Sequence, residues 1–163
     1  MAQESDHEQF TALFEAHGGA LMGLLRRLCG NQPDADDAFQ ETAVRVWKNL
    51  SSRPWLRNPR SWLMSIGYRA FLDLQTRRPR GEPLLDPPDA SARSPRELAE
   101  KAEDCDRVHT AIGTLPDRVR EVVVLHYVGG LSISQTAAAM GIADGTVKSR
   151  LNSALATLRS ALE

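Results

Sequence analysis

The sequence predicts an all-α protein of two small helical domains joined by a proline-rich linker. Apolar residues recur at three- and four-residue spacing over most of the chain, which is the period of a helix with one buried face. Residues 79–95 have no such period and are rich in proline, which favours an extended segment. Residues 129–150 have the form of a helix-turn-helix. We therefore expect domains over residues 1–78 and 96–163, with residues 79–95 as the linker.

The first domain is expected to contain three helices. The first spans about residues 6–29, and a glycine pair at its middle, Gly18 and Gly19, can split it. The second begins at the N-cap Asp34 and continues to about residue 50. Its expected inner positions are Ala38, Phe39, Thr42, Val46 and Trp47. The third spans residues 60–78. Its expected inner positions are Trp62, Leu63, Ile66, Ala70 and Leu74.

The second domain is expected to begin with a helix that Ser94 caps and that ends near residue 114. A further helix runs from about residue 117 to residue 127. Ser132 then caps a short helix, and Gln135, three residues on, can complete a capping box. Gly141 supplies the left-handed residue that ends the short helix, and the last helix starts near Asp144.

The last helix has one apolar and one polar side. Its apolar positions recur at helical spacing and are Val147, Leu151, Leu155, Leu158 and Leu162. The other side carries Lys148, Ser149, Asn152 and Ser153, which suit base edges and phosphates in a major groove. An ordinary helical hairpin with a polar outer side is the alternative interpretation.

Charge is balanced over the whole chain, with 20 basic and 21 acidic residues, but it is unevenly distributed. Residues 1–44 are acidic apart from Arg26 and Arg27, and residues 45–80 are basic apart from Asp73. An acidic block beside a basic one indicates two different partners. The second helix offers a strip of side chains at helical spacing, which is either a binding surface or a solvated helix side. Its members are Asp37, Gln40, Glu41 and Val44.

Arginines and aromatic residues alternate through the basic block. Phosphates can pair with arginines while unstacked bases lie on the rings, so this pattern suits single-stranded nucleic acid. A plain basic surface is the alternative. The residues concerned are Trp55, Arg57, Arg60, Tyr68, Arg69, Arg77 and Arg78.

Other classes of protein find little support in the sequence. Cys29 and Cys105 lie far apart and without metal-ligand spacing, so we expect reduced thiols and no metal or other cofactor. No nucleophile has a base at a recognisable spacing, so we expect no enzymatic activity. The polar start and the lack of a long apolar run predict a cytoplasmic protein without membrane insertion.

Taken together, the motifs resemble the extracytoplasmic-function (ECF) sigma factors, which are specificity subunits of bacterial RNA polymerase. The stretch GNQPDADDAFQETAVRVW at 30–47 is similar to the core-binding helix of that family. The stretch RSWLMSIGYRAFLDLQTRR at 60–78 is similar to its helix for melting and reading the downstream promoter element. The stretch LPDRVREVVVLHYVGGLSISQTAAAMGIADGTVKSRL at 115–151 is similar to its upstream-element reader.

This resemblance implies partners and roles. The strip Asp37, Gln40, Glu41 and Val44 would meet the clamp helices of the largest polymerase subunit, and the flap of the second subunit would be a further contact. The loop at 51–59 would capture a flipped base of the non-template strand. The downstream DNA contacts would be Arg53, Trp55, Arg57, Arg60, Tyr68, Arg69, Arg77 and Arg78. The upstream DNA contacts would be Thr146, Lys148, Ser149, Arg150, Asn152 and Ser153. An anti-sigma factor would hold the protein inactive.

The sequence departs from the family pattern at three places. Asn152 and Ser153 follow the KSRL stretch where relatives often carry further arginines or an aromatic residue, so promoter binding without polymerase should be weak. Ala143 stands where a serine usually caps the recognition helix, which leaves Asp144 as the expected cap. Arg69 stands where asparagine is common. A regulator that binds duplex DNA without joining polymerase is the alternative function, and it would leave the strip on the second helix without a role.

Overall fold

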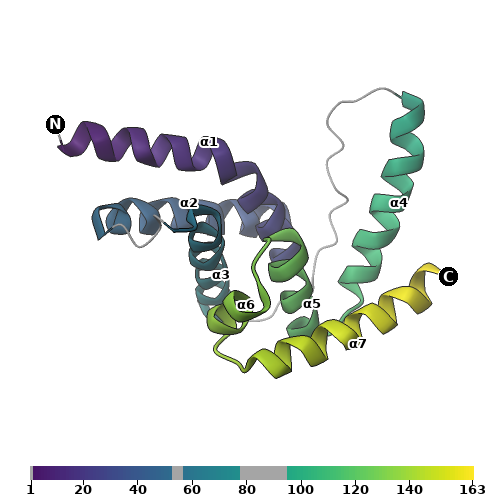
Figure 1. Ribbon diagram of the computed structural model, residues 1–163. Helices are drawn as coiled ribbons and strands as arrows, with labels where there is room; N and C mark the ends of the chain where they lie inside the picture. The colour runs from purple at the N-terminus through teal and green to yellow at the C-terminus, as the bar shows by residue number, and fades with distance from the viewer. Residues whose placement is uncertain (1, 53–56, 78–94) are drawn as a thin grey trace.

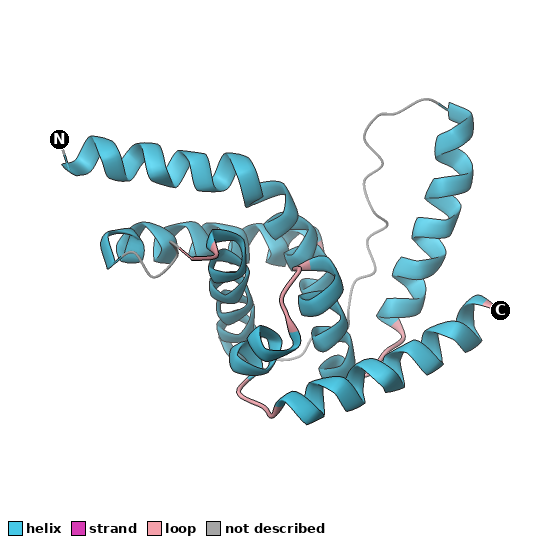
Figure 2. Cartoon of the chain, viewed as in Figure 1, coloured by secondary structure: helices cyan, strands magenta, loops and turns pink. Residues whose placement is uncertain are grey.

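The computed structural model describes residues 2–52, 57–77 and 95–163, and all regular structure in these residues is helical (Figures 1 and 2). This confirms the all-α prediction. The elements are α1 (Ala2–Cys29), α2 (Gln32–Asn49), η1 (Leu50–Ser52), α3 (Pro59–Arg77), α4 (Pro95–Gly113), α5 (Asp117–Val123), η2 (Val124–Val128), α6 (Ile133–Met140) and α7 (Asp144–Leu162). The expected linker up to Ser94, together with Arg53, Trp55 and Arg78, lies outside the described residues.

Helices α1, α2 and α3 pack on one another and form the N-terminal half. Helix α1 is continuous through Gly18 and Gly19, so this pair does not split it. Gly18 is buried against α2, where a Cβ atom would lie 3.9 Å from the ring of Phe39. Packing of α1 against its neighbours therefore outweighs the low helix propensity of the two glycines.

Two details of α2 correct the sequence-based prediction. The N-cap is Asn31 and not Asp34, because the Asn31 side chain accepts a hydrogen bond of 2.9 Å from the Asp34 amide. Helix α2 can then include Pro33 in its first turn, where the missing N–H has no partner to lose. Trp47 is 48 % exposed and is therefore not a core residue. Its ring lies edge-on to that of Phe10, with 5.5 Å between the centroids.

The C-terminal half contains the predicted helix-turn-helix. Ser132 and Gln135 form the capping box of α6, and Gly141 ends α6 in the left-handed conformation with a φ of 66°. Asp144 is not the cap of α7, because Ala143 occupies the cap position and gives no side-chain hydrogen bond. Asp144 instead accepts a hydrogen bond of 2.9 Å from the Ser134 hydroxyl, which ties the start of α7 to α6.

The buried side of α7 is shorter than its apolar pattern. Val147, Leu151 and Ala154 are buried, whereas Leu155 and Leu162 are 36 % and 37 % exposed. The second half of α7 extends beyond α5 and α6 toward α4, as Figure 1 shows. Fewer neighbours surround this part of the helix, so the apolar stripe is only partly covered.

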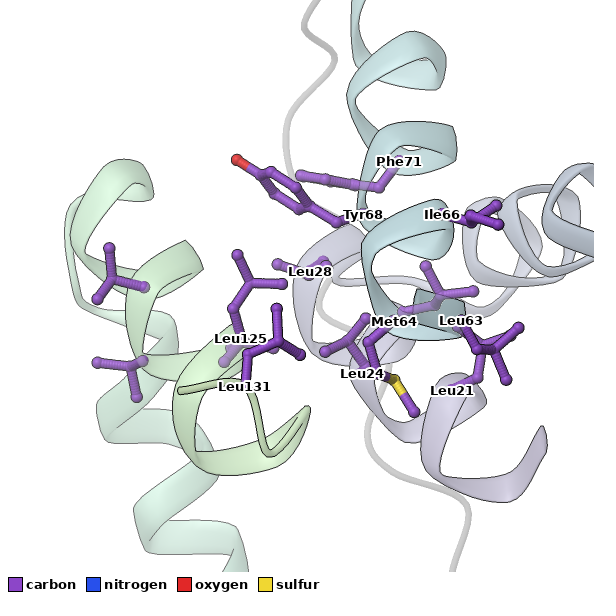
Figure 3. Close-up of a cluster of buried hydrophobic side chains, with 14 of the residues drawn as sticks. Leu21, Leu24, Leu28, Leu63, Met64, Ile66, Tyr68, Phe71, Leu125 and Leu131 are labelled. Atoms are coloured by element: carbon purple, nitrogen blue, oxygen red, sulfur yellow. The ribbon is translucent and has the colours of Figure 1, made fainter. Parts of the chain in front are cut away.

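The two halves share one hydrophobic core. Buried side chains from α1 and α3 form a single cluster with those from α5, η2 and the turn before α6. Figure 3 shows Leu125 and Leu131 of the C-terminal half facing Leu24, Leu28 and Met64 of the N-terminal half. The sequence predicts two helical units but not this contact between them.

Candidate functional site

The strip on α2 is at the surface. Asp37 and Gln40 are exposed, Val44 is 48 % exposed, and Glu41 is partly buried. The residues that alternate with them, among them Ala38, Thr42 and Val46, are buried against the neighbouring helices. The helical period therefore places the strip on the side of α2 that faces away from the core, as the sequence predicted.

An arginine joins this strip to α3. Arg45 donates from Nε to Glu41 Oε1 at 2.8 Å and from Nη2 to Asp73 Oδ2 at 2.6 Å. Partial burial lowers the pKa of Arg45, but the hydrogen bonds to Asp73 and Glu41 outweigh the burial and leave the pKa above its usual value. Arg45 was recognised in the sequence only as part of the basic block. The structure shows that it bridges α2 and α3.

The downstream DNA residues do not form one continuous surface. Arg57, Arg69 and Arg77 are exposed, whereas Arg60 is partly buried and Tyr68 is 1 % exposed. Arg53, Trp55 and Arg78 lie outside the described residues. In this arrangement Tyr68 has no access to a base, so its contact with DNA stays a prediction that requires the two halves to separate.

Tyr68 is buried because it binds the C-terminal half. Its hydroxyl donates to Glu121 Oε2 at 2.5 Å, and Arg118 Nη1 lies 3.3 Å from the same oxygen. Burial, followed by the hydrogen bond to Glu121, raises the pKa of Tyr68 well above its usual value. Tyr68 is therefore a neutral donor at physiological pH. Glu121 was not singled out in the sequence, because a lone acid in an apolar helix gives no sign of a partner 53 positions earlier.

Two further residues of α3 make hydrogen bonds to the C-terminal half. Arg60 donates from Nη2 to the carbonyl of Val128 at 3.3 Å and from Nε to that of Gly129 at 3.4 Å. The hydroxyl of Ser61 donates to Gln135 Oε1 at 3.2 Å. The amide oxygen of Gln135 thus serves both the capping box of α6 and the contact with α3.

The polar side of α7 is open to solvent. Lys148, Ser149, Asn152 and Ser153 are exposed, and Arg150 and Thr146 are partly buried. The capping box of α6 and the bond between Ser134 and Asp144 fix the direction of α7. The structure therefore places the predicted upstream-reading side chains on the second helix of the helix-turn-helix, and most of them are accessible. Their contact with a major groove stays a prediction.

Apart from these surfaces, the structure has a hollow next to a titratable histidine. A hollow between α1 and α4 is lined by Arg27, Asp104, Cys105, Val108, His109 and Ile112. Burial, followed by the charge of Arg27, lowers the pKa of His109.

In the part of the chain that the structure describes, no group of three or more metal-ligating side chains is placed to hold a metal ion. No helix in the same part is long and apolar enough to cross a membrane.

Comparison with known proteins links both halves to one family. Residues 13–81 match sigma-70 region 2, and residues 105–158 match sigma-70 region 4. The ECF RNA polymerase sigma factor SigL of Mycobacterium tuberculosis is 31 % identical over 156 residues, which cover 93 % of this chain and 88 % of SigL. The ferric citrate uptake sigma factor FecI of Escherichia coli is 31 % identical over 145 residues, which cover 85 % of this chain and 82 % of FecI.

Solved structures agree with these matches. The structure of CnrH in complex with the cytosolic domain of CnrY is similar with a TM-score of 0.67 and 29 % identity, over 96 % of this chain and 88 % of CnrH. The sigma factor RpoE of Bartonella quintana, in complex with the anti-sigma factor NepR, has the same fold with a TM-score of 0.69 and 22 % identity, over 96 % of this chain and 95 % of RpoE. The chain belongs to the extracytoplasmic-function sigma factors of the sigma-70 family.

Proposed function

We propose that this protein is a sigma factor that binds core RNA polymerase, directs it to specific promoters and assists strand separation. The observation that carries the proposal is the simultaneous exposure of two chemically different surfaces. The strip on α2 is acidic and apolar, and the polar side of α7 carries a lysine and hydrogen-bonding side chains on a helix-turn-helix. The first suits a protein partner and the second suits duplex DNA.

We assign the two tasks to the two domains. Residues 1–78 bind polymerase through Asp37, Gln40, Glu41 and Val44 and read the downstream element with α3 and the loop before it. Residues 96–163 read the upstream element with α7. The match to regions 2 and 4 of the family, in this order, supports the division. None of these steps requires a covalent catalyst, and we place the activity with polymerase in the cytoplasm.

We further propose that an anti-sigma factor controls the protein. The relative CnrH has been solved in complex with the cytosolic domain of CnrY, which shows that this fold can accept a partner over its surface. The half-exposed apolar residues Val44 on α2 and Leu155 and Leu162 on α7 offer apolar area for such a contact.

A binding assay with core polymerase tests the proposal. Asp37→Arg reverses a charge in the strip, and Glu15→Arg makes the same change at an exposed position of α1. The wild type and Glu15→Arg are expected to bind core polymerase equally, and Asp37→Arg at least tenfold more weakly. If the wild type does not bind core polymerase but binds a specific duplex in a salt-sensitive way, it is a stand-alone regulator instead.

A further inference from the structure

One side of α3 contacts the C-terminal half over more than two helical turns. Arg60 and Ser61 make their contacts at the start of α3, and Tyr68 makes its own farther along the same helix. At 1.5 Å per residue, the interval from Arg60 to Tyr68 is about 12 Å. The partners of these residues come from three successive elements, α5, η2 and α6. The two halves therefore meet along an extended interface and not through one isolated hydrogen bond.

Glu121 is a buried charged residue at this interface. Its residue is 6 % exposed, and a buried carboxyl group lowers stability unless hydrogen bonds replace its lost water. The shortest of its hydrogen bonds comes from the other half, since the Tyr68 hydroxyl lies at 2.5 Å and Arg118 of its own helix lies at 3.3 Å. The Glu121 carboxylate therefore has both of these hydrogen bonds only when the two halves are in contact.

The backbone around η2 lies at the same contact. A Cβ atom on Gly129 would lie 2.7 Å from the carbonyl oxygen of Leu125 in η2 and 2.9 Å from Leu24 Cδ1 of α1, so the turn itself requires glycine, and the same glycine lets α1 come close. The π-helical turn η2 directly precedes Gly129, and such turns are rare and occur frequently at functional sites. Leu125 and Leu131, on either side of Gly129, are both buried in the shared core (Figure 3).

We infer that the Arg60, Ser61 and Tyr68 side of α3 is a docking surface for the protein's own C-terminal half, and that the free sigma factor closes on itself there. The consequence for promoter reading rests on the proposed function. The closed form occupies Tyr68 and Arg60, two of the residues proposed to read the downstream element, while it leaves the polar side of α7 accessible. Docked and DNA-bound states then compete for the same face of α3.

Small-angle X-ray scattering of the whole chain with a charge-swap pair tests the docking. Tyr68→Glu places two carboxyl groups together in the closed form, and Glu121→Lys places a lysine beside Arg118. Each single variant is expected to shift the ratio of closed to open molecules toward the open form by at least the ten- to hundredfold that a buried hydrogen bond to a charged group contributes. The radius of gyration should therefore increase in each single variant, and the double variant should return toward the wild-type value.

The rim of the interface supplies a second pair of variants that does not disturb the buried Tyr68 and Glu121. Arg60→Glu directs a carboxylate at the carbonyl oxygens of residues 128 and 129, whereas Arg69→Glu makes the same change at an exposed position of α3. Only Arg60→Glu is expected to expand the protein. An extended wild type, unchanged scattering in all variants, or a loss of helical circular dichroism in Glu121→Lys would each overturn the inference.

Binding to core polymerase separates this inference from the proposed function. If only the open form binds, Glu121→Lys should bind core polymerase more tightly than the wild type, because less of the protein is withheld in the closed form. Expansion in scattering without any binding to polymerase would support the docking and contradict the proposed function. Equal binding by the expanded variant and the wild type would overturn any control of polymerase binding by closure.

Discussion

The packing of α3 on α1 can be tested at Gly67, where α3 lies against the Leu21 side chain of α1. A Cβ atom added at Gly67 would lie 2.5 Å from Leu21 Cδ1, which is well inside van der Waals contact. Leu21 is fully buried, so its side chain cannot turn out into solvent. We expect Gly67→Ala to force either Leu21 off its rotamer or α3 away from α1.

The magnitude follows from two opposing effects. Overpacking of a well-packed core costs about 1–3 kcal/mol. Alanine gains about 1 kcal/mol over glycine in a helix interior, which offsets part of that cost. Gly19 provides a matched control, because it lies inside α1 and nothing is within 4 Å of an added Cβ atom. Gly19→Ala should therefore stabilise the protein, and the difference between the two variants should be about 1–3 kcal/mol, since the helix preference cancels.

Urea unfolding of both variants and the wild type, followed by circular dichroism at 222 nm, measures these effects. The expected order of unfolding midpoints is Gly19→Ala, then wild type, then Gly67→Ala, with unchanged slopes. A Gly67→Ala variant that matches Gly19→Ala in stability would refute the reasoning, because it would show that α1 and α3 are not packed at this distance.

Three further predictions concern single groups. The pKa of Tyr68 is raised in the closed form, so the neutral hydroxyl stabilises the closed form fully below about pH 10, and this stabilisation is lost as the pH rises further. Scattering of the wild type should therefore show opening above this pH, whereas Tyr68→Phe should show no such step. The pKa of His109 is lowered in the folded protein, so the neutral imidazole stabilises the fold above pH 6.5, and this stabilisation is lost as the pH falls. The free energy of unfolding, measured in urea, should therefore fall less between pH 7.5 and pH 5.5 in His109→Gln than in the wild type. Ser132→Ala removes the cap of α6 and should cost about 1 kcal/mol, measured by thermal unfolding against Ser149→Ala at an exposed position of α7, and equal loss in both would contradict the capping role.

The features that the sequence predicted depend on neighbours along the chain. The capping box of Ser132 and Gln135 and the left-handed Gly141 each involve residues within a few positions, so their chemistry can be recognised without a fold. The strip on α2 was found in the same way, because the helical period separates Asp37 and Gln40 from the buried Ala38.

The features that the sequence did not predict depend on residues far apart in the chain, or on a choice between neighbouring residues that could each cap the same helix. The burial of Tyr68 requires α3 to meet α5, and no local pattern carries that information. The exposure of Trp47 depends on where α1 passes over α2. The sequence alone does not decide between Asn31 and Asp34 as cap, because both are good caps. Pro33 fits the first turn after an Asn31 cap and is equally tolerated just before an Asp34 cap. The cap predicted at Asp144 failed because its carboxylate binds Ser134 instead.

The most direct test of the central claim is run-off transcription with purified core polymerase on promoters selected from genomic DNA, with the wild type compared with Asp37→Arg and Lys148→Glu. We expect the wild type to start transcripts at a discrete set of sites. Asp37→Arg should lose those transcripts because it no longer binds core polymerase, and Lys148→Glu should bind core polymerase but lose the same sites. A wild type that joins core polymerase without changing where transcription starts, or that never joins it, would contradict the account.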